Sequence, residues 1–146
     1  MTILVSIQQP IVAWQIPEAA VARLADRCRH HTIVHATTPE ARRQGLTTCD
    51  VAFTWVLTPD ELVTAPRLRW VHSSAVAVGT LCLAELAARG IVVSNSRQIQ
   101  STPIAEHVFA SLLALTRQLP LAFERQGQAH WAQNEFAGPH LPTVLR

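Results

Sequence analysis

Five short runs of apolar and β-branched residues recur along the first 95 residues, each about as long as a β-strand. Segments with helical periodicity separate these runs. Parallel neighbouring strands must be joined by a crossover, which is usually a helix. The alternation therefore predicts an α/β fold with a doubly wound, five-stranded parallel sheet. The five runs span residues 3–7, 32–36, 51–55, 69–74 and 91–95.

Several helix boundaries can be read from single residues. Thr38 and Thr58 each precede a proline and an acidic residue, a pattern typical of a helix N-terminus. The threonine side chain accepts a hydrogen bond from a free N–H of the first turn, and the proline has no N–H that would need a partner. Pro17 opens a further helical segment. Gly90 can adopt the left-handed conformation that ends a helix, and the fifth strand begins directly after it.

The pattern changes to helices after the fifth strand. A long helix is predicted from Pro103 to about Leu119, and its apolar face is wider than a single sheet face can cover. We therefore divide the chain into a sheet domain, residues 1–100, and a helical arm, residues 101–146. The apolar stripe of the long helix consists of Ile104, Val108, Leu112, Leu115 and Leu119, widened by Ala105, Phe109 and Leu113.

Composition argues against several classes of partner. Twelve arginines, no lysine and ten acidic residues give a net charge of +2, and the arginines form no block longer than Arg42 and Arg43, so no nucleic-acid partner is expected. The longest helix carries Glu106 and His107 and is too short to span a membrane. Three cysteines far apart predict neither a disulfide framework nor a zinc site, and we expect a cytoplasmic protein.

The histidines do not predict a metal site. His30, His31 and His35 lie around a turn into a strand and share no common face. His72 and Ser73 are neighbours in a strand, so their side chains point to opposite faces and do not predict a catalytic dyad.

The loop in "VHSSAVAVGTL", residues 71–81, is the strongest candidate site. Small residues follow the fourth strand there, at the carboxyl edge where open α/β sheets bind ligands, and successive backbone amides could hold a carboxylate. Alternatively, "AVAV" simply continues the buried strand. Nucleotide binding is not predicted, because the five glycines form neither G-x-G-x-x-G nor G-x-x-x-x-G-K-[ST].

Three stretches resemble the D-isomer-specific 2-hydroxyacid dehydrogenase family: "LRWVHSSAVAVGTL", "ELAARGIVVSNSRQIQSTPIAEHVFASLLALTRQLP" and "QAHW". The resemblance is close over about residues 60 to 135. It implies a flavodoxin-like substrate domain, from which the long helix crosses into a Rossmann domain that binds NAD or NADP. The family's cofactor turn and its catalytic arginine, glutamate and histidine would lie beyond residue 146.

The resemblance also implies roles for particular residues. The loop whose amides hold the substrate carboxylate corresponds to Ala75, Val76, Ala77, Val78 and Gly79. Ala77 stands where the family usually has glycine, and Gly79 where it usually has aspartate. The start of the long helix lies near the cofactor in the family, so the residues implied to be cofactor-facing are Thr102, Glu106 and His107.

Two functions follow from this resemblance. The first is a non-catalytic α/β module, half of a dehydrogenase, that binds no cofactor. The alternative is a component of an NAD(P)-dependent 2-hydroxyacid oxidoreductase completed by another polypeptide. The uncovered apolar stripe predicts a homodimer that exchanges residues 103–132, with "NSRQIQS" as the hinge. Its interface would contain Ile104, Val108, Phe109, Leu112, Leu115 and Leu119.

Overall fold

A computed structural model describes residues 1–7 and 9–144 of the chain. It contains two compact units, Met1–Arg97 and Gln98–Arg146, which we describe separately. Gln8 of the first turn and the last two residues of the predicted helical arm lie outside the described residues.

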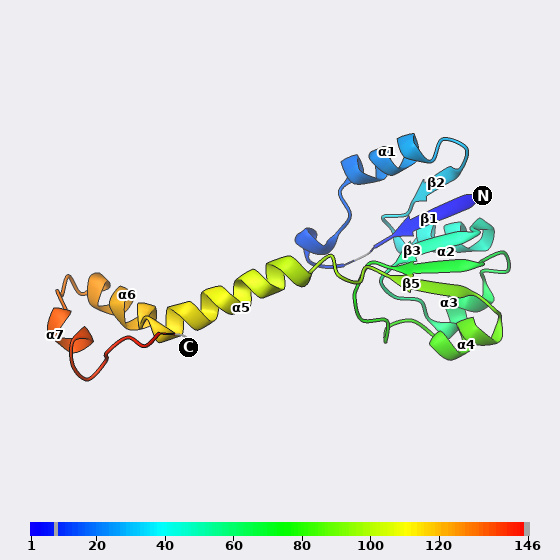
Figure 1. Ribbon diagram of the computed structural model, residues 1–146. Helices are drawn as coiled ribbons and strands as arrows, with labels where there is room; N and C mark the ends of the chain where they lie inside the picture. The colour runs from blue at the N-terminus through cyan, green and yellow to red at the C-terminus, as the bar shows by residue number, and fades with distance from the viewer. Residues whose placement is uncertain (8, 145–146) are drawn as a thin grey trace. The chain divides into compact units, whose positions relative to one another are not determined.

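The first unit is built on a five-stranded, all-parallel sheet with the strand order β2-β1-β3-β4-β5 (Figure 1). This order confirms the predicted flavodoxin-like, doubly wound α/β fold. Each strand lies within a residue or two of its predicted position. The strands are β1 (Thr2–Ser6), β2 (Thr32–His35), β3 (Val51–Thr54), β4 (Trp70–Ser73) and β5 (Val92–Asn95).

The helix starts after Thr38 and Thr58 and the helix end before Gly90 lie where the local signals placed them. The Thr38 side chain accepts a hydrogen bond from the third residue of its helix, and Thr58 forms a reciprocal capping box with Glu61. Gly90 has a φ of 66°, as expected of the residue that follows a helix. The helices are α1 (Glu18–Arg27), α2 (Pro39–Thr48), α3 (Pro59–Val63) and α4 (Leu83–Ala88), with a short 3-10 turn, η1 (Val12–Trp14).

The core lies on one face of the sheet, between the strands and α2, α3 and α4. Leu4, Ala52 and Val71 lie opposite one another on neighbouring strands and are fully buried, as are leucines from the covering helices. Gly45 allows α2 to approach β1 closely, because a Cβ atom there would lie only 2.5 Å from Leu4 Cδ1.

The other face of the sheet is covered unevenly. Helix α1 packs on the β2 side, where Val21 is its buried residue. Trp70 of β4 and Val92 of β5 stay 44% and 61% exposed on this face. The half of the sheet formed by β4 and β5 therefore presents apolar surface within the described residues.

The second unit consists of α5 (Ser101–Thr116), α6 (Leu119–Gly127) and α7 (Gln133–Phe136). The prediction of one helix from Pro103 to Leu119 is wrong at both ends. The helix begins two residues earlier, and it ends at Thr116 because Gln118 adopts a left-handed conformation with a φ of 56°. Leu119 therefore starts α6, ahead of Pro120, and does not belong to the α5 stripe.

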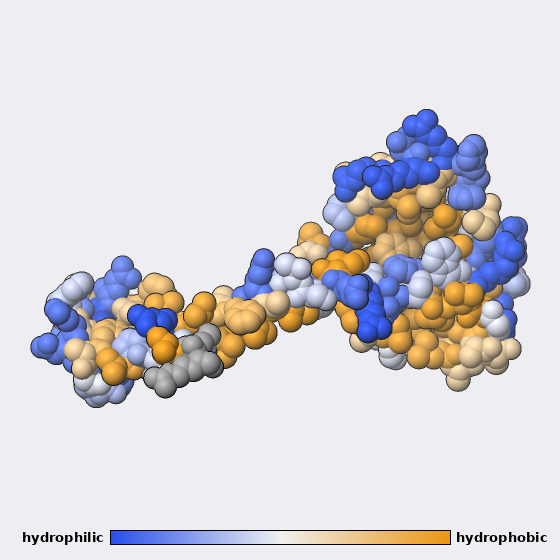
Figure 2. All heavy atoms as spheres, viewed as in Figure 1, coloured by the Kyte–Doolittle hydropathy of each residue, from blue (hydrophilic) through white to orange (hydrophobic). Residues whose placement is uncertain are grey.

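The apolar side chains of α5 are exposed, and none of its residues is buried. Figure 2 shows hydrophobic residues on the surface of this helical unit. No helix in the described part of the chain is long and apolar enough to cross a membrane. The exposed fractions are 58% for Ile104, 47% for Val108, 60% for Phe109, 41% for Leu112, 48% for Leu113 and 64% for Leu115.

Candidate functional site

The loop between β4 and α4 lies at the carboxyl edge of the sheet. Strand β4 ends at Ser73, so the alternative in which "AVAV" continues the strand is wrong. The Ser74 N–H donates to the Thr54 carbonyl (3.1 Å), and the Thr80 hydroxyl donates to the Trp55 carbonyl (2.6 Å). Both ends of the loop are therefore fixed on the end of β3.

Backbone amides at the centre of this loop are free. The Ala75 N–H donates to Ser73 Oγ (3.2 Å), and the Asn95 side chain donates to the Val76 carbonyl (2.6 Å). The amides of residues 76–79 have no hydrogen-bond acceptor among the described residues. Successive unpaired N–H groups of this kind can donate hydrogen bonds to an anion.

Ala77 and Gly79 of this loop are both exposed. A Cβ atom at Gly79 would meet nothing within 4 Å, and Gly79 is not one of the described glycines with a positive φ. Ala77 is exposed, whereas Val78 packs against the core. The backbone geometry of the loop therefore does not depend on a glycine at position 79.

The three residues implied to face a cofactor lie on α5, in the helical unit. Thr102, Glu106 and His107 are all exposed, and the first two share one face of the helix because they are four residues apart. They belong to a different compact unit from the residue 75–79 loop.

Two tryptophans meet at the same edge as the loop, and sequence reasoning missed this pair. Trp14 lies in the turn after β1, Trp55 directly follows β3, and their ring centroids are 5.6 Å apart with the planes tilted by 34°. Trp14 is 52% exposed and Trp55 is partly exposed. Trp55 was predicted as the last residue of the third strand and Trp14 as part of the turn after the first strand, and only the strand order of the sheet brings the two together.

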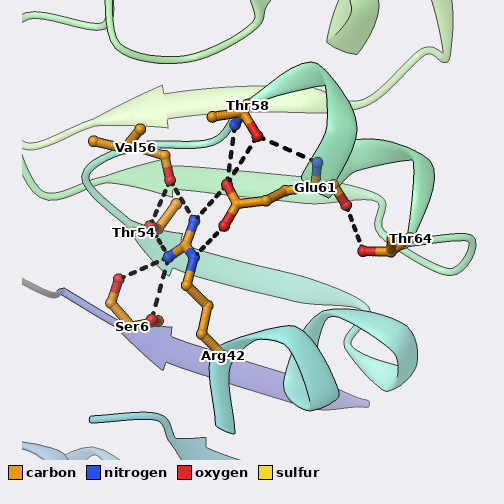
Figure 3. A network of polar contacts seen from close by, with 7 residues as sticks. All are labelled: Ser6, Arg42, Thr54, Val56, Thr58, Glu61 and Thr64. Carbon is orange, nitrogen blue, oxygen red and sulfur yellow. Dashed lines mark hydrogen bonds and ion pairs between the residues drawn. The ribbon is translucent and has the colours of Figure 1, made fainter. Parts of the chain in front are cut away.

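The backbone on both sides of Trp55 is held by a buried arginine, Arg42 of α2 (Figure 3). Its guanidinium donates to the Thr54 hydroxyl (2.8 Å), to the Val56 carbonyl (2.6 Å) and to Ser6 Oγ (3.2 Å) at the end of β1. It also forms a two-point ion pair with Glu61 of α3. One cation thus ties two strand ends and two helices together.

Glu61 is ionised in this network. Burial raises the pKa of its carboxyl group, but hydrogen bonds from Arg42 and from the Thr58 N–H act in the opposite direction and lower the pKa below its ordinary value. Because Arg42 directs its donors to these protein partners, it is not free to bind an external anion.

His72 ties β4 to β5 on the opposite face from Ser73. Its Nδ1 lies 2.8 Å from Ser94 Oγ, its Nε2 lies 3.3 Å from Ser96 Oγ, and the Trp70 indole donates to the same Ser94 oxygen. The prediction that His72 and Ser73 are neighbours in a strand is confirmed. Among the described residues, no three His, Cys, Asp or Glu side chains gather as metal ligands would.

Known proteins provide an independent comparison. D-3-phosphoglycerate dehydrogenase of Mycobacterium tuberculosis is 31% identical over 80 residues, which are 55% of this chain and 15% of that protein. The Mycobacterium leprae protein of the same name is 28% identical over 142 residues, which are 90% of this chain and 25% of that protein. No protein-family model matches the chain.

A comparison with solved structures finds proteins that share this fold. A D-isomer specific 2-hydroxyacid dehydrogenase family protein from Aeromonas salmonicida superposes with a TM-score of 0.65 at 27% identity, covering 89% of this chain and 40% of that structure. The chain therefore spans a quarter or less of the curated relatives and less than half of this solved structure.

We predict that Arg42→Met destabilises the fold. The substitution leaves the Glu61 carboxylate without its partner and unties two strand ends, so the free energy of unfolding should fall by about 2 to 3 kcal/mol. Urea unfolding followed by circular dichroism measures this change. Arg43→Met is the control: Arg43 is the next residue on α2, its ion pair with Glu40 is exposed, and its loss should cost less than about 0.5 kcal/mol.

The network should also make stability depend on acidity. The pKa of Glu61 is lowered by folding, so its contribution is present above the pKa of the unfolded chain and is lost as the pH falls through the lower folded value. The difference in unfolding free energy between the natural chain and Glu61→Gln should therefore shrink as the pH falls from about 6 to 3. Glu40→Gln is the exposed control, and a difference for Glu61→Gln that does not change with pH contradicts the prediction.

Proposed function

The chain is related to the catalytic-domain part of the D-isomer-specific 2-hydroxyacid dehydrogenases, and we propose that it supplies the carboxylate-binding half of such a site without catalysing hydride transfer itself. The observation that carries this proposal is the run of unpaired amides at residues 76–79. They lie at the carboxyl edge of a central strand, where open α/β sheets bind ligands.

Neutral amides alone give this loop a modest affinity. A carboxylate at residues 76–79 receives hydrogen bonds from the backbone, while Arg42 remains committed to Glu61. Val76, Ala77 and Gly79 are exposed, so water competes for the same donors. Binding of small 2-hydroxy or 2-oxo acids is therefore expected to be weak and selective for the carboxylate group.

The residues of this chain do not fit a dinucleotide. The turn after β1 carries Gln9, Pro10 and Ile11 where a pyrophosphate needs a bare, glycine-rich backbone. Hydride transfer also needs an arginine to polarise the carbonyl and a histidine to move the proton. Arg125 and His130 do lie close together, but both form ion pairs with Glu135, at 3.0 and 3.2 Å. These pairs link α6 to α7.

An alternative proposal is that a second polypeptide completes the enzyme. In that case the 146-residue chain binds a 2-hydroxy acid, and the other polypeptide supplies the NAD(P)-binding turn and the catalytic groups. NADH oxidation by a 2-oxo acid would then appear only in the mixture.

We also propose that the chain self-associates through α5. Its side chains from Ile104 to Leu115 form a stripe about half exposed, and Trp70 and Val92 leave apolar surface on the sheet. Burying such surface contributes about 25 cal/mol per Å². A homodimer that exchanges residues 103–132, so that each α5 covers the sheet of its partner, would bury both surfaces at once.

We predict that small carboxylates bind at residues 76–79 and that NADH does not bind. Addition of oxalate to the ¹⁵N-labelled chain should shift the amide signals of residues 76–79, because these amides lack acceptors. Calorimetry with NADH should show no saturable binding. Shifts confined to His30, His31 and His35, or micromolar NADH binding, would contradict the proposal.

The self-association proposal predicts a dimer in light scattering. Leu115→Glu should convert this dimer into a folded monomer, because Leu115 is 64% exposed and its replacement leaves the fold of the single chain intact. Ala110→Glu is the matched control, since Ala110 lies on the other side of α5 and is also exposed. A natural chain that is monomeric at micromolar concentration refutes the proposal.

A further inference from the structure

We propose that Trp14 and Trp55 form the selectivity surface of the carboxylate site and that they favour 2-oxo and 2-hydroxy acids with an aromatic side chain. This inference rests on the proposed function, because it assigns the ligand's carboxylate to residues 76–79. It adds the chemical class of the group that the carboxylate carries.

The position of Trp55 places this surface beside the amides. Thr54, just before it, accepts from the Ser74 N–H, and the carbonyl of Trp55 itself accepts from the Thr80 hydroxyl. The loop with the free amides thus starts and ends on the backbone that carries Trp55. The residue that carries the indole and the loop that carries the free amides are therefore joined directly at this edge of the sheet.

Both tryptophans are held in place before any ligand binds. Arg42 fixes the Thr54 hydroxyl and the Val56 carbonyl, which flank Trp55 on its two sides. The backbone N–H of Trp14 donates to the Ile11 carbonyl (2.9 Å), and the Gln15 side chain donates to the Gln9 carbonyl (2.8 Å). The backbone that carries both tryptophans is thus fixed, and their rings contact each other at 5.6 Å, so little ordering is needed on binding.

The chemistry of the surface favours a flat, uncharged group. The two indoles touch each other at 5.6 Å and leave no space for a ring between them, so a ligand ring stacks on their exposed side. Trp14 keeps half of its surface free for this contact. Indole rings offer no cation to a phosphate, and Arg42 behind Trp55 is paired with Glu61, so an aryl group suits the surface better than a phosphate.

The test compares phenylpyruvate with pyruvate, which share the 2-oxo carboxylate and differ in the ring. Both acids should shift the amide signals of residues 76–79 in the ¹⁵N-labelled chain. Phenylpyruvate alone should also shift the indole N–H signals of Trp14 and Trp55, and should bind roughly 3- to 10-fold more tightly than pyruvate. The indole signals of Trp70 and Trp131 serve as internal controls.

Variants separate a ring contact from a general effect on folding. Trp14→Ala should lower the affinity for phenylpyruvate to about that for pyruvate, whereas Trp14→Phe should keep part of the preference. Trp131→Ala is the control, because Trp131 is 86% exposed in the other compact unit. The spectrum of each variant reports whether it is folded, and Trp14 tolerates replacement because it is half exposed.

The outcomes distinguish the two proposals. If pyruvate and phenylpyruvate shift residues 76–79 with equal affinity and leave Trp14 and Trp55 unmoved, the aromatic selectivity is wrong and the carboxylate site stands. If neither acid shifts residues 76–79, the proposed function is wrong and the inference falls with it. An unchanged preference in folded Trp14→Ala also overturns the inference.

Discussion

The carboxyl edge of the sheet depends on one buried charge, the guanidinium of Arg42. A buried cation is stable only when carboxylate and oxygen acceptors surround it, and here they come from β1, from the end of β3 and from α3. These elements meet only in the folded sheet, so the network forms together with the fold. It fixes the backbone on both sides of Trp55, on which both ends of the loop with the free amides are anchored.

Local signals explain why much of the fold could be predicted. Thr38 and Thr58 satisfy amides within their own helices, and Gly90 supplies a conformation that other residues avoid, so each acts whatever the rest of the chain does. The end of α5 could not be predicted in this way, because it has no comparable local signal. Gln118 is no usual left-handed residue, and the apolar periodicity continues past it; Pro120 was the only local sign that a new helix begins.

Only the part of the candidate site that comes just after a strand in the sequence could be predicted, because the end of a strand also lies at the carboxyl edge of the sheet. Residues 75–79 follow a central strand directly, which places them at the carboxyl edge in any doubly wound sheet. The Trp14–Trp55 contact requires β1 and β3 to be neighbours, and the Arg42–Glu61 pair requires α2 and α3 to lie side by side. These contacts join residues 19 to 41 positions apart, so no local pattern reveals them.

The proposed binding and the proposed association would be energetically connected. Amides that face water give up hydrogen bonds to solvent when they donate to a carboxylate, so the net gain is small until another surface excludes that water. The rigid part of the site, held by Arg42, supplies geometry but does not enclose a ligand. The exposed stripe on α5 and the apolar half of the sheet are the surfaces whose burial can stabilise an assembly. On the proposed function, tight binding would therefore require a second surface that excludes water from the carboxyl edge.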